Sequence, residues 1–224
     1  TYGNEKKGLV PSTEWKKNNL GKGWVLGETL ITGIGQGYIL TTPLQLCLMT
    51  AQLANGGYKI YPRITVGESD EKFEDIKDLI KKNSKSANDI KDGISEASEQ
   101  LMSFVKEKKY KPLYRNSENV KLIQSAMFAS TNEVRGTSYA SRIDDPKYQF
   151  AGKTGTSQVK RISIKQRELE LKTSEIPYNE RDHALYIAFG PYKNPRYALS
   201  IVIEHGGSGS STAAPMAKKL FKLI

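Results

Sequence analysis

A short polar stretch, Lys153-Thr154-Gly155-Thr156, has the residue types to bind an anionic ligand. A lysine, two hydroxyls and a glycine suit an extended ligand held against the backbone better than they suit a core. If the stretch is a strand, Thr154 and Thr156 share one face with their hydroxyls about 7 Å apart, close enough to flank a carboxylate. Lys153 then lies on the other face. Both faces serve one ligand only along a strand edge, where Gly155 lets a foreign backbone approach. A polar turn is the simple alternative.

Nucleotide binding is a second alternative, because Gly152-Lys153-Thr154 also matches the end of a phosphate-binding P-loop. That pattern requires another glycine five positions before Gly152, where this chain has Lys147. A P-loop also runs directly into a helix, whereas residues 155–159 favour an extended segment. We therefore favour the strand.

The composition bounds the fold more than the function. With 224 residues and 38% hydrophobic content, the chain is long enough for one domain or a large part of one. Its formal charge of +10 favours anionic partners, such as nucleic acid, anionic lipid or a carboxylate-rich polymer, without selecting one. Because the chain begins at Thr1 rather than Met, we expect it to be part of a longer product. A signal peptide or membrane anchor is not present in it.

Cysteine and histidine are rare. Cys47 is the single cysteine, which excludes an internal disulfide and a cysteine metal site, and its apolar neighbours predict a small buried residue. His183 and His205 are the only histidines. Two separate histidines argue against a metal site or a Ser-His-Asp triad, so acid–base chemistry must use another residue type, with lysine the obvious candidate. We expect no metal and no cofactor.

The strongest helix signal lies at residues 43–55. Thr42 is suited to cap it, Pro43 to occupy its first position, and Gln45 to complete a capping box. Gly56 or Gly57 ends it. Apolar residues lie all round this helix, so we expect it to be buried on most sides.

The glycine-rich stretch Gly33-Ile34-Gly35-Gln36-Gly37 does not have the spacing of a dinucleotide-binding fingerprint. Residues 38–41 continue in an extended pattern rather than opening a helix. A packed turn is the default interpretation.

The remaining pattern predicts an α+β fold. A second helix is expected at 117–132, with Val120, Ile123, Met127 and Phe128 facing inward and Gly136 breaking the chain after it. Strands follow at the Lys153 stretch, at 184–189 and at 197–203, the last two apolar enough to be covered on both faces. A final helix at about 212–224 carries a wide apolar stripe. The result is an antiparallel sheet with helices packed on it.

Residues 67–111 differ in composition, with alternating acidic and basic residues and narrow apolar stripes. We interpret them as two solvent-facing helices of a surface insertion, without chemistry of their own.

Four segments, taken in order, resemble the class B penicillin-binding proteins, most closely the elongation type. They are Gly33–Gly37 followed by Thr42-Pro43-Leu44-Gln45; Ala151–Thr156; Asp182-His183-Ala184; and Glu204-His205-Gly206-Gly207. The resemblance covers residues 9–66 and 117–224. It implies part of a serine transpeptidase and β-lactamase type of fold, in which an edge strand with Lys-Thr/Ser-Gly lines the active site.

The resemblance also implies roles for the residues of that strand. Lys153 would supply positive charge, and Thr154 and Thr156, with Gly155 between them, would hold the carboxylate of a stem peptide or of penicillin. The backbone N–H of Thr156 would form half of an oxyanion hole, and the N–H of the nucleophilic serine the other half.

The chain departs from the family pattern before Gly33, where no Ser-x-x-Lys or Ser-x-Asn/Asp motif occurs. We therefore expect residues 1–224 to be the C-terminal part of the transpeptidase domain, with the nucleophile upstream and no activity in this chain alone. Matches within the chain, at Ser103–Lys106, Ser117–Asn119 and Ser157–Lys160, are interpreted as chance occurrences.

For the parent protein the resemblance implies a peptidoglycan D,D-transpeptidase at the periplasmic face of the bacterial inner membrane. Its partners would be peptidoglycan stem peptides, β-lactam antibiotics and other proteins of the elongation machinery, with no nucleic acid. Only a missing N-terminal anchor would contact the membrane. The alternative is a non-catalytic basic module that binds an anionic polymer.

Overall fold

The computed structural model describes residues 6–62, 111–159 and 173–223. It divides into two units, one made of residues 1–56 and 116–224 and the other of residues 57–115. The two helices predicted within 67–111 lie outside the described residues, apart from position 111. No helix in the described part of the chain is long and apolar enough to cross a membrane.

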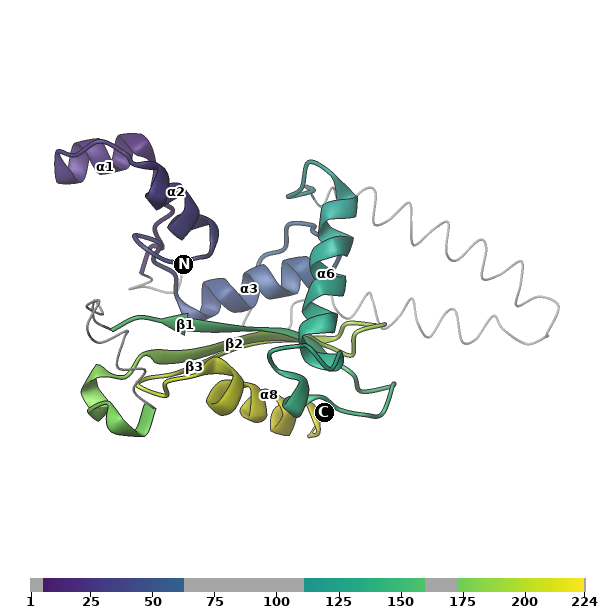
Figure 1. Ribbon diagram of the computed structural model, residues 1–224. Coiled ribbons are helices and arrows are strands. Elements are labelled where there is room, and N and C mark those ends of the chain that lie inside the picture. The colour runs from purple at the N-terminus through teal and green to yellow at the C-terminus, as the bar shows by residue number, and fades with distance from the viewer. Residues whose placement is uncertain (1–5, 63–110, 160–172, 224) are drawn as a thin grey trace, which may run out of the picture. The chain divides into compact units, whose positions relative to one another are not determined.

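The first unit is built on a three-stranded antiparallel sheet of order β1-β2-β3 (Figure 1). The strands are β1 (Ala151–Ser157), β2 (His183–Gly190) and β3 (Tyr197–Ile203). Thr154 of β1 pairs with Tyr186, and Tyr186 pairs with Ile201 of β3. All three predicted strands and the α+β class are confirmed, and among the described residues β1 pairs only with β2.

Helices cover both faces of this sheet. Figure 1 shows α3 (Pro43–Ala54) on one face and α8 (Ala214–Phe221) on the other, with α6 (Ser117–Asn132) crossing the end of the sheet near β1. Two helices that sequence patterns did not predict, α1 (Thr13–Leu20) and α2 (Leu26–Gly33), precede α3. Short 3₁₀ helices lie at Tyr139–Ser141, Thr173–Glu175 and Tyr178–Glu180.

The start of α3 follows its predicted cap. The Thr42 hydroxyl accepts from the Gln45 N–H at 3.2 Å, and the Gln45 side chain accepts from the Thr42 N–H at 2.9 Å. The helix ends one residue early, at Ala54, and Gly56 and Gly57 follow with φ of 92° and 88°, a conformation that favours glycine.

The prediction that α3 is buried on most sides is wrong for this chain. Within the helix only Thr50 is buried, while Leu44 and Met49 are 57% and 42% exposed. Helix α3 packs on β3, β2 and α6, so only one side of it is covered. Leu44 and Met49 are exposed, and the remaining apolar side chains after Pro43 are half-buried.

The two faces of the sheet have separate cores. On the α8 face, Phe150, Tyr186 and Phe221 pack among small alanines, and the rings of Phe150 and Phe221 stack with centroids 4.7 Å apart. On the α3 face, Met127, Ala151 and Phe189 form a smaller cluster. The alanines leave room for a π-helix, η4 (Gly209–Ala213), which leads into α8.

Helix α6 has the predicted bounds, and it buries Val120 and Met127 with Phe128 partly buried against the core. Ile123, predicted to face inward, is 44% exposed. Gly136 follows the helix closely, because a Cβ there would overlap the carbonyl groups of residues 129 and 130. A larger residue at 136 would push this turn off the helix.

The final helix is shorter and less deeply covered than predicted. It begins at Ala214, after η4, and buries Ala214, Ala217 and Phe221. Met216 and Leu220 are about half exposed, at 45% and 46%. The buried stripe is therefore narrow and uses small residues.

The second unit is described only at its ends, which pair with each other. Tyr58 and Pro112 form an antiparallel bridge, and the Tyr58 and Tyr114 hydroxyls lie 3.1 Å apart. The backbone N–H of Lys59 donates to Lys111 at 2.9 Å. The chain therefore enters and leaves residues 60–110 at neighbouring points.

Candidate functional site at the edge of β1

The free edge of β1 presents the backbone groups of alternate residues. The carbonyl oxygens of Phe150, Thr154 and Thr156 accept from Asn132 at 2.9 Å, Lys153 Nζ at 2.8 Å and Gln36 at 3.3 Å. None of these donors belongs to β2. Because the N–H and C=O of one antiparallel residue point the same way, the N–H of Thr156 also faces away from β2.

Lys153 and Thr154 are brought together over this edge. The exposed Lys153 ammonium, which donates to the Thr154 carbonyl, also lies 3.4 Å from its hydroxyl. The Thr154 hydroxyl is 3.3 Å from that of Thr137, which in turn is 3.2 Å from Ser130 at the end of α6. A cation and a chain of hydroxyls thus connect β1 to α6, an arrangement able to bind a carboxylate.

At both glycines of β1, a side chain would be crowded by neighbouring atoms. A Cβ on the buried Gly152 would overlap the Tyr186 hydroxyl, which is hydrogen-bonded at 2.9 Å to both Thr131 and Ser138. Burial raises the pKa of Tyr186, although both hydrogen bonds act in the opposite direction. A Cβ on Gly155 would lie 3.2 Å from Leu185 Cβ. The sequence had suggested only the approach of a foreign backbone at Gly155 and no role for Gly152.

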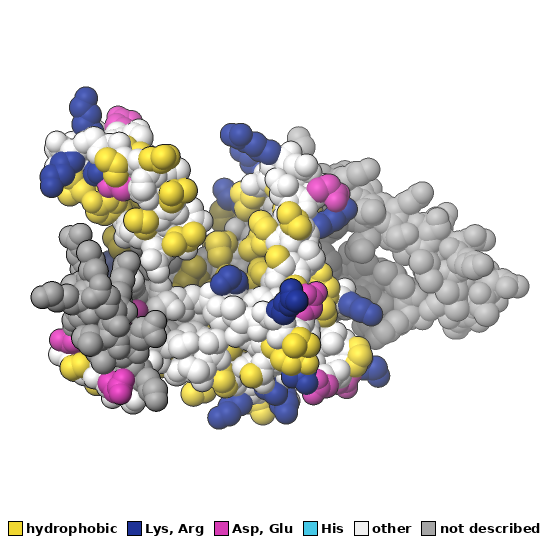
Figure 2. Space-filling model, in the orientation of Figure 1, with side chains coloured by type: hydrophobic (Ala, Val, Ile, Leu, Met, Phe, Trp, Pro, Cys, Tyr) yellow, Lys and Arg dark blue, Asp and Glu magenta, His cyan; other side chains and the backbone are white. Residues whose placement is uncertain are grey.

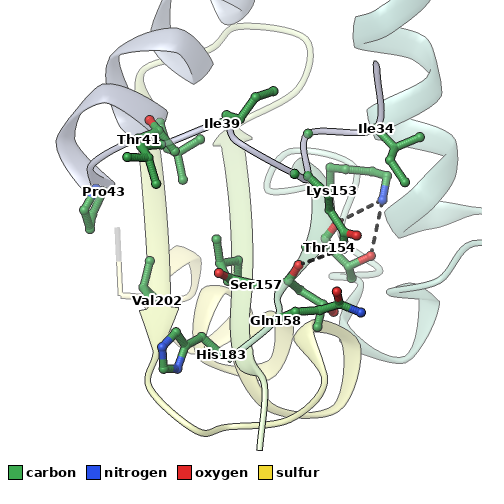
Figure 3. Close-up of a pocket in the computed structure, with 18 of the residues that line it drawn as sticks. Ile34, Ile39, Thr41, Pro43, Lys153, Thr154, Ser157, Gln158, His183 and Val202 are labelled. Carbon is green, nitrogen blue, oxygen red and sulfur yellow. Dashed lines mark hydrogen bonds between the residues drawn. The ribbon is translucent and has the colours of Figure 1, made fainter. Parts of the chain in front are cut away.

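A groove of about 880 Å³ runs along β1. In Figure 3, Lys153 and Thr154 lie toward one end of the groove, and His183 and Val202 lie toward the other. Ser157 lies between these two pairs. Residues 34–37 and the start of α3 also line it. The β1 residues in the lining are mostly polar, and apolar lining comes from other segments, including Leu46, Leu185 and Val202.

The predicted turn at Gly33–Gly37 also borders this groove, through residues 34–37. Gly35 and Gly37 have φ of 80° and 79°, which glycine adopts without strain. Between them Gln36 reaches the edge of β1. The predicted turn is confirmed, but the prediction that it is packed against the rest of the protein is not, because the Ile34 side chain is 75% exposed.

The two histidines, separate in the sequence, meet at the start of β2. Their ring centroids are 4.9 Å apart, and the His205 N–H donates to His183 Nδ1 at 2.9 Å. His183 pairs with Ser157 of β1 and lines the groove. The sequence offered no signal for this pairing beyond the two family segments that contain the histidines.

A second hollow of about 580 Å³ lies between α3 and α6, lined mainly by apolar side chains such as Met49, Leu53 and Met127. Lys153 and Ile187 border it from the sheet. Figure 2 shows hydrophobic side chains exposed over α2 and along the hollowed region beside α6. Lys153 therefore lies between a polar groove and an apolar hollow.

The described parts of the short serine motifs do not lie next to Lys153. Ser117–Asn119 is the first turn of α6, and a rise of about 1.5 Å per residue places it roughly 20 Å from Asn132, which reaches β1. Ser157 is the last residue of β1, directly after Thr156, and a strand rise of about 3.3 Å per residue places it roughly 13 Å along the strand from Lys153. Ser103–Lys106 and position 160 lie outside the described residues.

The described residues contain no cluster of three or more His, Cys, Asp or Glu side chains able to hold a metal ion. Cys47 is partly rather than fully buried, with Sγ 3.4 Å from the Ala198 carbonyl oxygen. Burial raises the pKa of its thiol, which lowers its reactivity.

Comparison with known proteins places this geometry in a family. Residues 2–222 match the model of the penicillin binding protein transpeptidase domain. Among curated proteins, peptidoglycan D,D-transpeptidase MrdA of Salmonella typhimurium is 34% identical over 96% of this chain and 30% of its own length. The MrdA protein of Acinetobacter baumannii is 33% identical over 97% of this chain and 27% of its own length.

Solved structures of penicillin-binding proteins are also similar to this chain. Pseudomonas aeruginosa PBP2, in complex with WCK 5153, is 29% identical with a TM-score of 0.63, covering 98% of this chain and 38% of that one. Helicobacter pylori PBP2, in complex with MreC, is 28% identical with a TM-score of 0.65, covering 99% of this chain and 32% of that one. The chain spans about a third of the length of its relatives. It belongs to the penicillin-binding protein transpeptidase family.

Proposed function

We propose that this chain forms one wall of the active site of a peptidoglycan D,D-transpeptidase, which crosslinks stem peptides through an acyl-enzyme on serine. The observation that carries the proposal is the free edge of β1, where Lys153, the two threonines and the outward N–H of Thr156 lie together along a groove. The family membership supports the same reaction.

In this proposal the stem peptide lies along β1 as an added strand. The hydroxyls of Thr154 and Thr156 bind its terminal carboxylate, and the charge of Lys153 stabilises that anion. When serine attacks the peptide carbonyl, negative charge develops on the oxygen, and the Thr156 N–H donates to it. The leaving residue departs, and the amine of a second stem peptide attacks the acyl-enzyme to form the crosslink.

We place the acylated serine in a part of the parent protein that precedes this chain. No Ser-x-x-Lys pattern occurs before Gly33, and the curated relatives are much longer than the chain. The apolar hollow beside Lys153 is a suitable position for the segment that bears the serine, because burying its apolar lining would be favourable. The serine would then lie close to Lys153, which borders both the hollow and the groove.

The parent protein is proposed to act at the periplasmic face of the inner membrane, held there by an anchor outside this chain. Partners from the elongation machinery are proposed on the basis of the Helicobacter pylori relative, whose structure contains MreC. We propose that residues 67–111 are a surface insertion. Their flanking segments pair at Tyr58 and Pro112, so a short Gly/Ser linker should replace them and leave the penicillin acylation rate within a few-fold.

The test is to incubate the full-length protein and this chain separately with excess fluorescent penicillin and to measure intact masses. We expect one covalent adduct per full-length molecule and none on the chain alone. Failure of the full-length protein to react would refute the transpeptidase assignment. An adduct on the chain, at Ser103 or Ser157, would instead refute the upstream serine.

Salt dependence separates this function from the alternative of a basic polymer-binding module, which the comparisons do not support. Binding of an anionic polymer by lysines weakens steeply as salt rises, whereas acylation by a small β-lactam should change little. The two measurements use the same protein across the same salt series.

A further inference from the structure

The loop after β3 is held by a hydrogen bond between the two histidines. The His205 N–H donates to His183 Nδ1 at 2.9 Å, and His205 has φ of 54°, the one positive value among the described residues other than glycine. A non-glycine residue keeps this left-handed conformation only where its surroundings compensate for the strain. The hydrogen bond that the His205 N–H donates to His183 provides such a compensation.

These contacts require different protonation of the two rings. Nδ1 of His183 accepts a hydrogen bond from the His205 backbone N–H, so the ring carries its proton on Nε2. Nδ1 of His205 lies 3.0 Å from the Arg181 carbonyl oxygen, which only accepts, so this nitrogen carries a proton. The arrangement thus places opposite tautomeric demands on the only two histidines of the chain.

Asp182, next to His183, accepts hydrogen bonds from two other segments of the chain. Its carbonyl oxygen accepts from the Gly207 N–H at 2.8 Å, and its carboxylate accepts from the Val159 N–H at 3.2 Å. The start of β2 therefore holds both the loop after β3 and the segment that follows β1.

This loop delivers Gly209 against the backbone of β1. A Cβ on Gly209 would overlap the Leu185 carbonyl oxygen and would lie 2.7 Å from the Gly155 carbonyl oxygen. The Gly155 carbonyl and the Thr156 N–H belong to one planar trans peptide, so they point in opposite directions and turn together. The position of Gly209 thus constrains the direction of the Thr156 N–H.

We propose that His183 is a positioning residue for the acylation step. Through His205 and the loop that follows, it keeps Gly209 against the Gly155 carbonyl and thereby keeps the Thr156 N–H directed at the developing oxyanion. This inference rests on the proposed transpeptidase function. His183 itself does not contact the reacting atoms, and its essential atom is the acceptor Nδ1.

Two amide variants of the full-length protein test the acceptor. In His183→Asn the amide oxygen takes the place of Nδ1, whereas in His183→Gln it takes the place of Nε2 and misses the His205 N–H. We expect the penicillin acylation rate constant of His183→Asn to stay within about threefold of the parent. We expect His183→Gln and His183→Ala to lose about tenfold or more, which is less than the hundredfold lost on removing an oxyanion donor outright. The dissociation constant of the complex before acylation should change little in all three.

Gly209→Ala tests the other end of the connection and should slow acylation in the same way, because the new methyl group cannot fit against β1. Glu204→Gln, an exposed change in the same loop, is the matched control and should react like the parent. Counting active sites by burst titration separates slow acylation from a smaller folded fraction.

Nitrogen NMR of this chain gives an independent readout, because only two imidazole rings contribute signals. We expect the Nε2–H tautomer for His183 and a protonated Nδ1 for His205. The inference is overturned if His183 carries its proton on Nδ1, or if His183→Gln acylates as fast as His183→Asn. If the full-length protein does not react with penicillin at all, the proposed function fails, while the tautomer result still stands by itself.

Discussion

The two faces of the sheet differ in how completely this chain covers them. On the α8 face, Ala184, Tyr186 and Ala188 are fully buried and Phe221 is 4% exposed. On the α3 side, Leu44 is 57% exposed, and Leu26 and Leu30 of α2 are 78% and 67% exposed. The first face is a closed core, whereas the second leaves several large apolar side chains exposed, as at an interaction site.

The proposed site lies on the open side of this contrast. Lys153 borders the apolar hollow between α3 and α6, and the groove of β1 opens beside the α2–α3 turn. The closed face stabilises the strands, and the open face leaves room for substrate and for further protein. Stability and chemistry should therefore respond to different substitutions.

The largest expected effect is on the closed face. Phe221→Ala removes a ring stacked on Phe150 and should destabilise this chain by about 3–5 kcal/mol, the usual cost of truncating a buried aromatic residue. Leu220→Ala, a neighbour that is 46% exposed, is the control and should cost much less. Urea unfolding measures both. Equal losses would mean that the α8 face is not the main core.

Lys153 should show the reverse pattern, affecting activity without stability. Lys153→Ala in the full-length protein should lower penicillin acylation by about a hundredfold, because one electrostatic stabiliser of the transition state is lost. Its melting temperature should change little, since the side chain is exposed. Lys147→Ala, another exposed lysine, should leave both properties unchanged. A collapse of stability in Lys153→Ala would make the residue structural.

A smaller effect is expected at the start of α3, on the open side. Thr42→Ala removes the side-chain acceptor of the capping box and should cost about 1 kcal/mol in free energy of unfolding. Thr41→Ala is the comparison: its hydroxyl caps no helix N–H and makes only long contacts, at 3.4 Å, to the Gln45 side chain and the Thr42 carbonyl oxygen, so its loss should cost less. If the two variants unfold at the same urea concentration, the cap does not contribute in this chain.

The smallest effect on stability is expected on α2. Replacing both Leu26 and Leu30 with Gln should change the free energy of unfolding by about 0.5 kcal/mol or less per site, because both side chains are already exposed. We also expect this exposed apolar surface to make the chain self-associate, and the double variant should do so less in sedimentation velocity. Strong destabilisation would show that α2 is part of a closed core and that the α3 side is not the open one.

Local patterns predicted the elements that carry the site. The cap at Thr42, the bounds of α6 and the three strands follow from spacing and propensity within a few residues, and the structure has them nearly as predicted. The edge position of β1 also agrees with the polar stretch from Lys153 to Thr156. Helices α1 and α2 were missed because glycine and polar residues weaken their periodicity.

Packing was harder to predict from the same residues. A helix with apolar residues on every side reads as buried, yet α3 is covered on one side only, because burial depends on what else is folded against it. The sequence of the final helix likewise predicts a wide buried apolar stripe. In the structure a π-helix precedes it, and only Ala214, Ala217 and Phe221 are buried.

The sequence alone determined which segments near the site are extended and where helix α3 begins. It also determined that Lys153, Thr154 and Thr156 lie within four consecutive positions. Tertiary structure alone decided that Gly152 makes room for Tyr186, that His183 meets His205, and that Gly209 reaches Gly155. The reason is physical. Dihedral preferences and hydrogen bonds of caps and turns act over a few residues, whereas these contacts join segments distant in the chain and exist only once the sheet has formed.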